Sequence, residues 1–340
     1  MKQPNLFDYA TSELSQDAFI LWLLQWANPD CADMDKALFE TAQCFVRLLL
    51  DNNELNISSV KCCKQKFHID VFAIVNDEYF ILIEDKTDTT EHQKQMTTYS
   101  QEIESQKEYK DFHKYCVYFK IGNESQEDIE KIRQYYHINN KNWKFKALQR
   151  HDILSVLNEY EGANVILQNY RERLGKLEKD YLSYKDSAPK NWSWGAWQGF
   201  CAELANHINS LWWGTVNAIS GAFVCAAWSK LTMSNGCQLK LQIEGHHRKS
   251  GRLCIKIEMP TITQKERYKI LIDYGRKIRD LAAENGLKLG RPKRYSSKGN
   301  VLTLACTEIE NIVNEEFEIN KILRTLTQYE KLISNFVKIN

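Results

Sequence analysis

The sequence lacks the cysteine patterns that identify many small folded proteins. Its ten cysteines are scattered, with no Cys-x-x-Cys pair and no regular spacing. This weighs against a structural zinc site and against a secreted disulfide framework, since both need cysteines at characteristic intervals. No internal repeat or low-complexity segment stands out either. We therefore expect reduced cysteines that pack as small hydrophobic residues.

The distribution of charged and apolar residues also predicts neither a secretory leader nor a membrane span. The first apolar run, residues 18–26, follows the acidic Glu13, whereas a leader opens with a basic region. The uncharged segment 211–229 approaches the length of a membrane span, but polar residues and two glycines dilute it. We expect Trp212 to begin an aromatic corner that leads into a strand. The sequence thus predicts a cytoplasmic protein with no membrane partner.

Length and charge divide the chain into two parts. A chain of 340 residues with 43% hydrophobic content is expected to fold as two domains. Residues 1–172 hold 19 Lys and Arg against 28 Asp and Glu, whereas residues 173–340 hold 26 against 16. We expect these ranges to be the domains, with the boundary between the change of charge and the helix-breaking segment 186–189. The acidic part suits a divalent cation, and the basic part suits a polyanion.

The first part has a regular order of predicted elements. Helical periodicity covers residues 12–26 and 35–50, and β-rich runs at 57–63, 67–75 and 79–85 predict a three-stranded meander. The following elements are a helix at 91–107, a strand at 115–121, a helix at 125–136, a strand at 143–148 and a mostly helical stretch at 153–181. The fold class is α/β, with an αβββαβ core.

The second part predicts a separate α+β domain. We expect strands at 222–230, 237–244, 253–259 and 301–307, and helices at 264–284 and 314–336. Apolar and polar residues largely alternate in the second and third of these strands. Such alternation is typical of a sheet with one face in water.

The predicted hairpin around residues 76–78 brings like charges together. With a three-residue turn, Asp70 lies directly across from Glu84, and Lys86 shares their face because side chains alternate along a strand. Opposed carboxylates destabilise a hairpin, and a divalent cation removes the conflict. Mg²⁺ would need the two carboxylates and the Asp85 carbonyl at most. A solvated hairpin end with a surface ion pair is the alternative.

These residues resemble the motifs of the PD-(D/E)XK nuclease superfamily. The resemblance lies in Ile69-Asp70, with Ile in place of the usual Pro, and in Glu84-Asp85-Lys86, on an αβββαβ core. Gln95-Met-Thr-Thr-Tyr99 resembles the Gln-x-x-x-Tyr pattern of exonuclease-like branches. Glu13 stands where several branches place a further acid, and residues 13–24 are similar to the opening of a bacterial group of the superfamily.

The resemblance implies a restriction-endonuclease-like core and a Mg²⁺-dependent or Mn²⁺-dependent phosphodiesterase that acts on DNA more readily than on RNA. Asp70 and Glu84 would bind the metal, with Asp85 and Glu13 as further metal residues. Lys86 would orient or help deprotonate the attacking water. Gln95 and Tyr99, one helical turn apart, would contact the substrate or position Lys86. A role in bacterial defence or DNA processing is also implied.

Two basic segments of the second domain are candidates for nucleic-acid contact. One holds Arg248 and Lys249, and the other holds Arg291, Lys293 and Arg294. Either could bind phosphates, although solvated loops commonly carry such charge.

Other functions stay open at this point. The fold could serve as a catalytically silent module that binds nucleic acid or protein, although a scaffold has no need of Asp70, Glu84 and Lys86 together. The second domain could instead be a sensor that holds the nuclease inactive until a ligand binds. A homo-oligomer and a defence-system partner protein are further expectations that the sequence leaves open.

Overall fold

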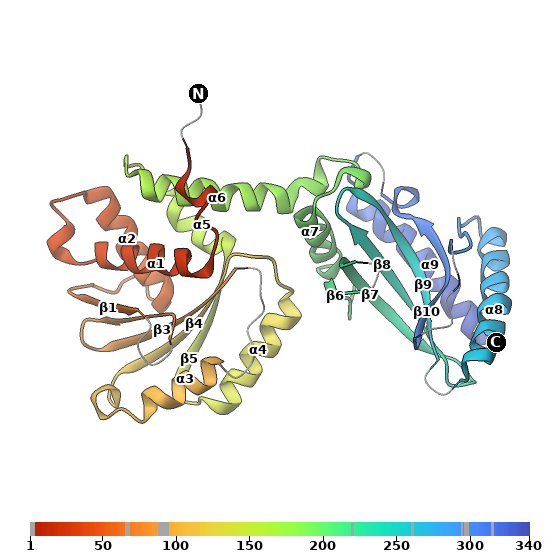
Figure 1. Cartoon of the computed structure of the whole chain (residues 1–340), viewed down its shortest axis with the longest axis horizontal. Helices are drawn as coiled ribbons and strands as arrows, with labels where there is room; N and C mark the ends of the chain where they lie inside the picture. Colours follow the sequence, from red (N-terminus) through yellow and green to blue (C-terminus); the bar gives the residue numbers. More distant parts are fainter. Residues whose placement is uncertain are drawn as a thin grey trace. The chain divides into compact units, whose positions relative to one another are not determined.

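A computed structural model of the chain describes residues 4–64, 69–87, 95–218, 221–259, 262–293, 295, 299–313 and 316–340. They form a mixed α/β structure with two five-stranded sheets. The chain divides into two compact units, Met1–Glu178 and Lys179–Asn340, which we call unit 1 and unit 2 (Figure 1). The division falls within helix α6 (Val165–Leu182), shortly after the change of charge at residue 172.

Unit 1 has the predicted order of helices and strands. Before α6 its elements are α1 (Glu13–Trp26), α2 (Lys36–Leu50), β1 (Val60–Lys64), β2 (Val71–Val75), β3 (Tyr79–Lys86), α3 (Gln95–Glu104), β4 (His113–Lys120), α4 (Gln126–Asn139), β5 (Trp143–Gln149) and α5 (Arg150–Asn158). From α2 to β4 the order is αβββαβ. The predicted starts at residues 67 and 91 lie outside the described residues, and the helix predicted at 153–181 is two helices, α5 and α6.

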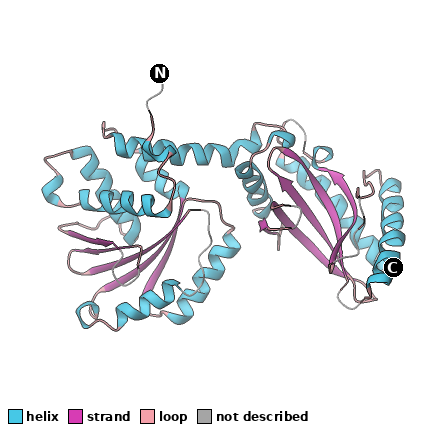
Figure 2. Ribbon diagram, viewed as in Figure 1, coloured by secondary structure: helices cyan, strands magenta, loops and turns pink. Residues whose placement is uncertain are grey.

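The sheet of unit 1 is mixed, with strand order β1-β2-β3-β4-β5. Strands β1 to β3 are antiparallel neighbours, which confirms the meander, whereas β4 and β5 run parallel to β3 (Figure 2). The helices α1, α2, α5 and α6 share one core with the sheet, and α3 and α4 share another. The central strands are therefore buried on both faces, as their long apolar runs require.

The alternation along β3 decides which way its last residues point. Ile81 and Ile83 belong to the core on the α1 side, whereas Phe80 and Leu82 belong to the core on the α3 side. Because the side-chain period of a strand is two, Glu84 continues the α3 side. The hydrophobic pattern thus sets the orientation of the polar strand end.

The hairpin between β2 and β3 has the predicted register. Val75 lies opposite Tyr79, and the turn residues Asn76 and Asp77 take positive φ angles of 56° and 53°. Asn and Asp adopt this left-handed conformation at lower cost than other side chains. The last pair of this hairpin is Val71 with Ile83. Asp70 precedes Val71 in the chain and lies just beyond the paired residues.

Unit 2 contains one antiparallel sheet with strand order β10-β9-β8-β7-β6. Its elements are α7 (Trp194–Ala205), β6 (Trp212–Val216), β7 (Phe223–Thr232), β8 (Gln238–His246), β9 (Lys249–Glu258), α8 (Gln264–Glu284), β10 (Val301–Glu308) and α9 (Ile319–Ile339). The sequence prediction missed α7 and β6. Among the described residues, no helix has the length and apolarity that a bilayer crossing needs.

The two faces of the second sheet differ from the prediction of one buried and one wet face. The helices α7, α8 and α9 pack on the face that carries Leu241 and Ile255. The opposite face carries Gln242, Glu244 and Lys256, but these side chains are buried as well. They pair with one another, which offsets part of the desolvation penalty of burying them.

Candidate active site

Glu84 and Lys86 form a close pair at the end of β3. Lys86 Nζ lies 2.6 Å from Glu84 Oε1, and the exposed fractions of the two side chains are 9% for Lys86 and 1% for Glu84. Parallel pairing with β4 continues to Lys86, so the backbone is ordered up to this point. The structure therefore places a buried ion pair where the sequence places the Glu-x-Lys motif.

Asp70 reaches the same end of the sheet from the start of β2. Its Oδ2 accepts a hydrogen bond from the backbone N–H of Asp85 at 3.4 Å. Burial raises the pKa of Asp70, while the charge of Lys86 and this hydrogen bond partly oppose the shift. Asp70 is thus close enough to Lys86 to interact with its charge.

Glu13 joins this group from the first residue of α1. Its Oε1 accepts a hydrogen bond from the backbone N–H of Thr87 at 3.2 Å. The negative charge of Glu13 acts on both Asp70 and Lys86. A helix that packs on the other side of the sheet therefore supplies a third carboxylate to the strand end.

The charge balance of this group is negative. Glu13, Asp70 and Glu84 are three carboxylates that act on the ammonium group of Lys86. Burial by itself lowers the pKa of Lys86, but its hydrogen bond with Glu84 and the surrounding negative charge raise the pKa above its ordinary value. Lys86 is therefore protonated at neutral pH.

The helix α3 brings Gln95 and Tyr99 to the group. A hydrogen bond joins the two side chains, and Gln95 Oε1 is buried without a hydrogen-bond partner among the described residues. Burial raises the pKa of Tyr99, and the negative charges of Glu84 and Asp70 add to the increase. Tyr99 is thus close enough to Glu84 and Asp70 to interact with both charges.

Asp85 has a different environment from Glu84 and Lys86. Its Oδ1 accepts a hydrogen bond from Gln16 Nε2 of α1, and its side chain is fully buried. Burial raises the pKa of Asp85 well above its ordinary value, and the charge of Asp17 raises it further. The Asp85 carboxylate therefore faces α1, whereas the predicted metal role of Asp85 concerned its backbone carbonyl.

The prediction from sequence missed the residues that surround Asp85. Gln16 and Asp17 follow Glu13 by one helical turn and are buried, which is unusual for polar residues on an apolar helix face. Tyr170 of α6 is also buried, and its hydroxyl has no hydrogen-bond partner among the described residues. Two adjacent polar residues at the start of an apolar helix could have indicated the role of Gln16 and Asp17. The sequence around Tyr170 contains no comparable indication.

A second buried lysine lies beside the site. Lys120, the last residue of β4, is opposite Lys86 in the parallel register and is 2% exposed. Paired residues of neighbouring strands point to the same face, so both lysines lie on the α3 side. Nearby, Gly122 approaches the Thr87 carbonyl so closely that a Cβ atom would lie 2.0 Å from its oxygen. Glycine is therefore required where the two strand ends leave the sheet.

The site suits a metal ion that needs few protein ligands. Among the described residues, no group of three or more His, Cys, Asp or Glu side chains is arranged to hold a metal ion. Mg²⁺ commonly binds one or two carboxylates and keeps several waters. Asp70 and Glu84, with the excess negative charge around Lys86, fit an ion of this kind.

The predicted basic residues of unit 2 lie on separate elements. Arg248 and Lys249 are exposed at the turn between β8 and β9, where the Arg248 N–H donates to the carbonyl oxygen of Trp192 at 2.8 Å. Arg291 and Lys293 are exposed in the segment after α8. Arg294 lies outside the described residues.

Comparisons of the chain with models of protein families, with curated proteins and with solved structures each find no match. A functional assignment therefore depends on the residues and geometry of the chain itself.

Proposed function

We propose that unit 1 is a metal-dependent nuclease of the PD-(D/E)XK type that hydrolyses phosphodiester bonds in DNA. The observation that carries the proposal is the gathering of Asp70, Glu84, Lys86 and Glu13 at one end of the sheet. The αβββαβ order and the parallel pairing of β3 with β4 agree with a restriction-endonuclease-like core.

In this proposal Asp70 and Glu84 would hold Mg²⁺ or Mn²⁺, with Glu13 beside them. A bound divalent cation supplies Lewis-acid catalysis and lowers the pKa of a coordinated water. Lys86 is protonated, so its role is to place positive charge beside the phosphate on which negative charge develops. The raised pKa of Lys86 favours this electrostatic role over that of a general base.

The helix α3 supplies neutral hydrogen-bonding groups to the same region. Gln95 and Tyr99 are one turn apart, and their side chains bond to each other. The raised pKa of Tyr99 keeps its hydroxyl protonated, so it can donate a hydrogen bond to a phosphate oxygen. The two residues would thus orient the substrate backbone relative to Lys86.

The proposal is tested by incubating the purified full chain with linear and circular DNA in the presence of Mg²⁺ or Mn²⁺. We expect cleavage by the wild-type chain and its loss in Glu84→Gln. Glu54→Gln is the matched control, because Glu54 is an exposed acid in a loop of the same unit. Equal cleavage by wild type and Glu84→Gln would assign the activity to a contaminant.

A second candidate is a catalytically silent module that binds nucleic acid. It is favoured by the engagement of Glu84 with Lys86 at 2.6 Å, which leaves that carboxylate neutralised without a metal. This candidate predicts no effect of Mg²⁺ on the thermal midpoint of the chain. A nuclease site predicts a Mg²⁺-dependent rise that is absent in Asp70→Asn.

A further inference from the structure

The segment that follows α8 is the most one-sided in charge in unit 2. Residues 288–299 contain five Lys or Arg residues and no Asp or Glu. Unit 2 as a whole holds 24 Lys and Arg against 15 Asp and Glu. The segment therefore concentrates the positive charge of the unit.

Gly290 and Tyr295, two described residues of this segment, contact β10. Gly290 pairs with Cys306, with an N–H to oxygen distance of 2.7 Å in one direction and 3.1 Å in the other. Further along, the Tyr295 hydroxyl donates to the carbonyl oxygen of Leu304 at 3.2 Å. Of the residues between these contacts, Arg291 and Lys293 belong to the described part of the chain, and the paired Gly290 directly precedes Arg291.

Two guanidinium groups converge on the ring of Tyr295. Arg279 of α8 donates from Nη1 to the Tyr295 hydroxyl at 2.9 Å, and Arg291 Cζ lies 4.9 Å from the ring centroid. Gly275 gives the hydroxyl its space, because a Cβ atom there would lie 2.6 Å from the Tyr295 oxygen. The helix, the segment and the ring therefore form one arrangement, which sequence spacing alone does not indicate.

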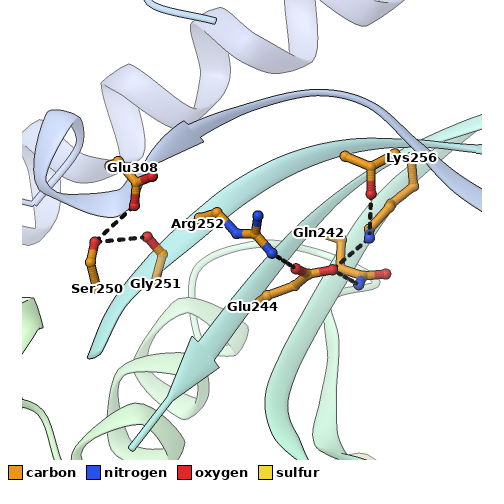
Figure 3. Close-up of polar contacts among 8 residues, drawn as sticks. Gln242, Glu244, Ser250, Gly251, Arg252, Lys256 and Glu308 are labelled. Carbon is orange, nitrogen blue, oxygen red and sulfur yellow. Dashed lines mark hydrogen bonds and ion pairs between the residues drawn. The ribbon is translucent and has the colours of Figure 1, made fainter. Parts of the chain in front are cut away.

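These cations differ from the other basic residues of the sheet. Arg252 lies 3.0 Å from Glu244, and Lys256 lies 2.5 Å from the same carboxylate (Figure 3). Within the described part of the chain, neither Arg279 nor Arg291 forms an ion pair with a carboxylate. Two positive groups held near each other repel, and a bound anion would remove the repulsion.

We propose that Arg279, Arg291 and the exposed Lys293 form a phosphate-binding surface around Tyr295, and that its ligand is the backbone of a nucleic acid. Guanidinium groups match the geometry of phosphate oxygens, and the anchored ring keeps both groups oriented. A run of positive charge with no acid suits a polyanion better than a single small anion. The choice of nucleic acid as the polyanion rests on the proposed nuclease function.

The test is the binding of a fluorescein-labelled DNA duplex to the full chain in EDTA, measured by anisotropy at several salt concentrations. For Arg279→Gln/Arg291→Gln we expect affinity to fall roughly tenfold per arginine. The slope of log K against log salt should become less steep by about 2, because each arginine neutralises one phosphate in the wild-type complex.

Arg324→Gln/Lys331→Gln is the matched control, since both side chains are exposed on α9 and the same charge is removed. We expect its affinity to fall less than threefold. An equal loss in the control, or wild-type binding by the Arg279 and Arg291 variant, would overturn the surface. Arg291→Gln alone, with an expected tenfold loss, decides the matter if the double variant does not fold.

The two proposals fail separately in these experiments. Binding is measured without divalent cations. A chain that binds DNA through this surface but never cleaves it would therefore contradict only the proposed nuclease function. If the chain cleaves DNA and the double variant binds DNA as tightly as the wild type, only the proposed phosphate-binding surface is contradicted.

Discussion

Each unit buries a glutamate against a lysine, and the two pairs have nearly the same distance between their charged groups. In unit 1 the distance between Glu84 and Lys86 is 2.6 Å, and in unit 2 the distance between Glu244 and Lys256 is 2.5 Å. The surroundings differ. Glu244 has a second cation, Arg252, at 3.0 Å, whereas Lys86 is shared among several carboxylates.

An acid near each pair has a shifted pKa, and the two shifts have opposite directions. Burial raises the pKa of Glu244, but the charge and hydrogen bond of Lys256, with Arg252, outweigh burial and lower it. At the strand end of unit 1, burial prevails and the pKa of Asp70 is raised. Glu244 thus has two cations as partners, whereas in unit 1 several carboxylates share Lys86, which is the feature on which the proposed metal site rests.

The largest expected effect is on catalysis. Lys86→Met removes the cation on which Glu13, Asp70 and Glu84 all act, so we expect the rate of DNA cleavage to fall by about 10³-fold. The measurement is the initial rate at saturating Mg²⁺. Lys256→Met, which breaks the corresponding pair of unit 2, should leave the rate within about twofold once the chain is folded. Similar losses in both variants would mean that the two pairs do not differ in function.

The next effect is on the stability of unit 2. Glu244→Gln leaves Lys256 and Arg252 without their carboxylate, and we expect a loss of about 3 kcal/mol in the free energy of unfolding in urea. Glu258→Gln is the control, because its pair with Lys230 at 3.6 Å is partly exposed and should contribute less than about 1 kcal/mol. Equal losses would show that burial does not distinguish these pairs.

A substitution at Asp85 is expected to stabilise the chain, by less than Glu244→Gln destabilises it. Because its folded pKa is raised, the folded state binds a proton more tightly than the unfolded chain, and stability falls as pH rises from the ordinary pKa near 3.8 through the folded value. Asp85→Asn keeps an acceptor for Gln16 and removes the charge. We expect the free energy of unfolding at pH 7 without divalent cations to rise by about 1 to 2 kcal/mol.

Glu244 gives the contrasting pH dependence. Its folded pKa is lowered, so its contribution to stability is present above the ordinary value near 4.5 and is lost as pH falls through the folded pKa. The loss of unfolding free energy caused by Glu244→Gln should therefore become smaller as the pH falls. The increase in unfolding free energy caused by Asp85→Asn should also become smaller, because Asp85 itself becomes neutral at low pH. A cost of Glu244→Gln that does not change with pH would contradict the charge-pair explanation.

The smallest effect is expected at α3. Tyr99→Phe removes one neutral hydroxyl beside the carboxylates, and we expect cleavage to slow by about fivefold, with the loss in kcat and not in KM. Tyr135→Phe is the control, because this tyrosine lies on α4 and interacts with neither Glu84 nor Asp70 in the described structure. If Tyr99→Phe cleaves DNA at the wild-type rate, the Tyr99 hydroxyl has no role in the reaction.

Local pattern was sufficient to predict much of unit 1. The meander and the register of Val75 with Tyr79 follow from a side-chain period of two and a three-residue turn. These features depend on neighbours that are close along the chain. The alternation in unit 2 likewise located its strands, but it gave the wrong environment for Glu244 and Lys256, which are buried.

Only the tertiary structure decided which distant side chains meet. Gln16 meets Asp85, and Arg279 meets Tyr295, across helices and strands whose packing no local window contains. Composition determined that one part of this protein is acidic and the other basic. Whether a given charge is neutralised depends on the partner that folding brings within a few ångströms, because electrostatic interactions are strong only at short range and in buried surroundings.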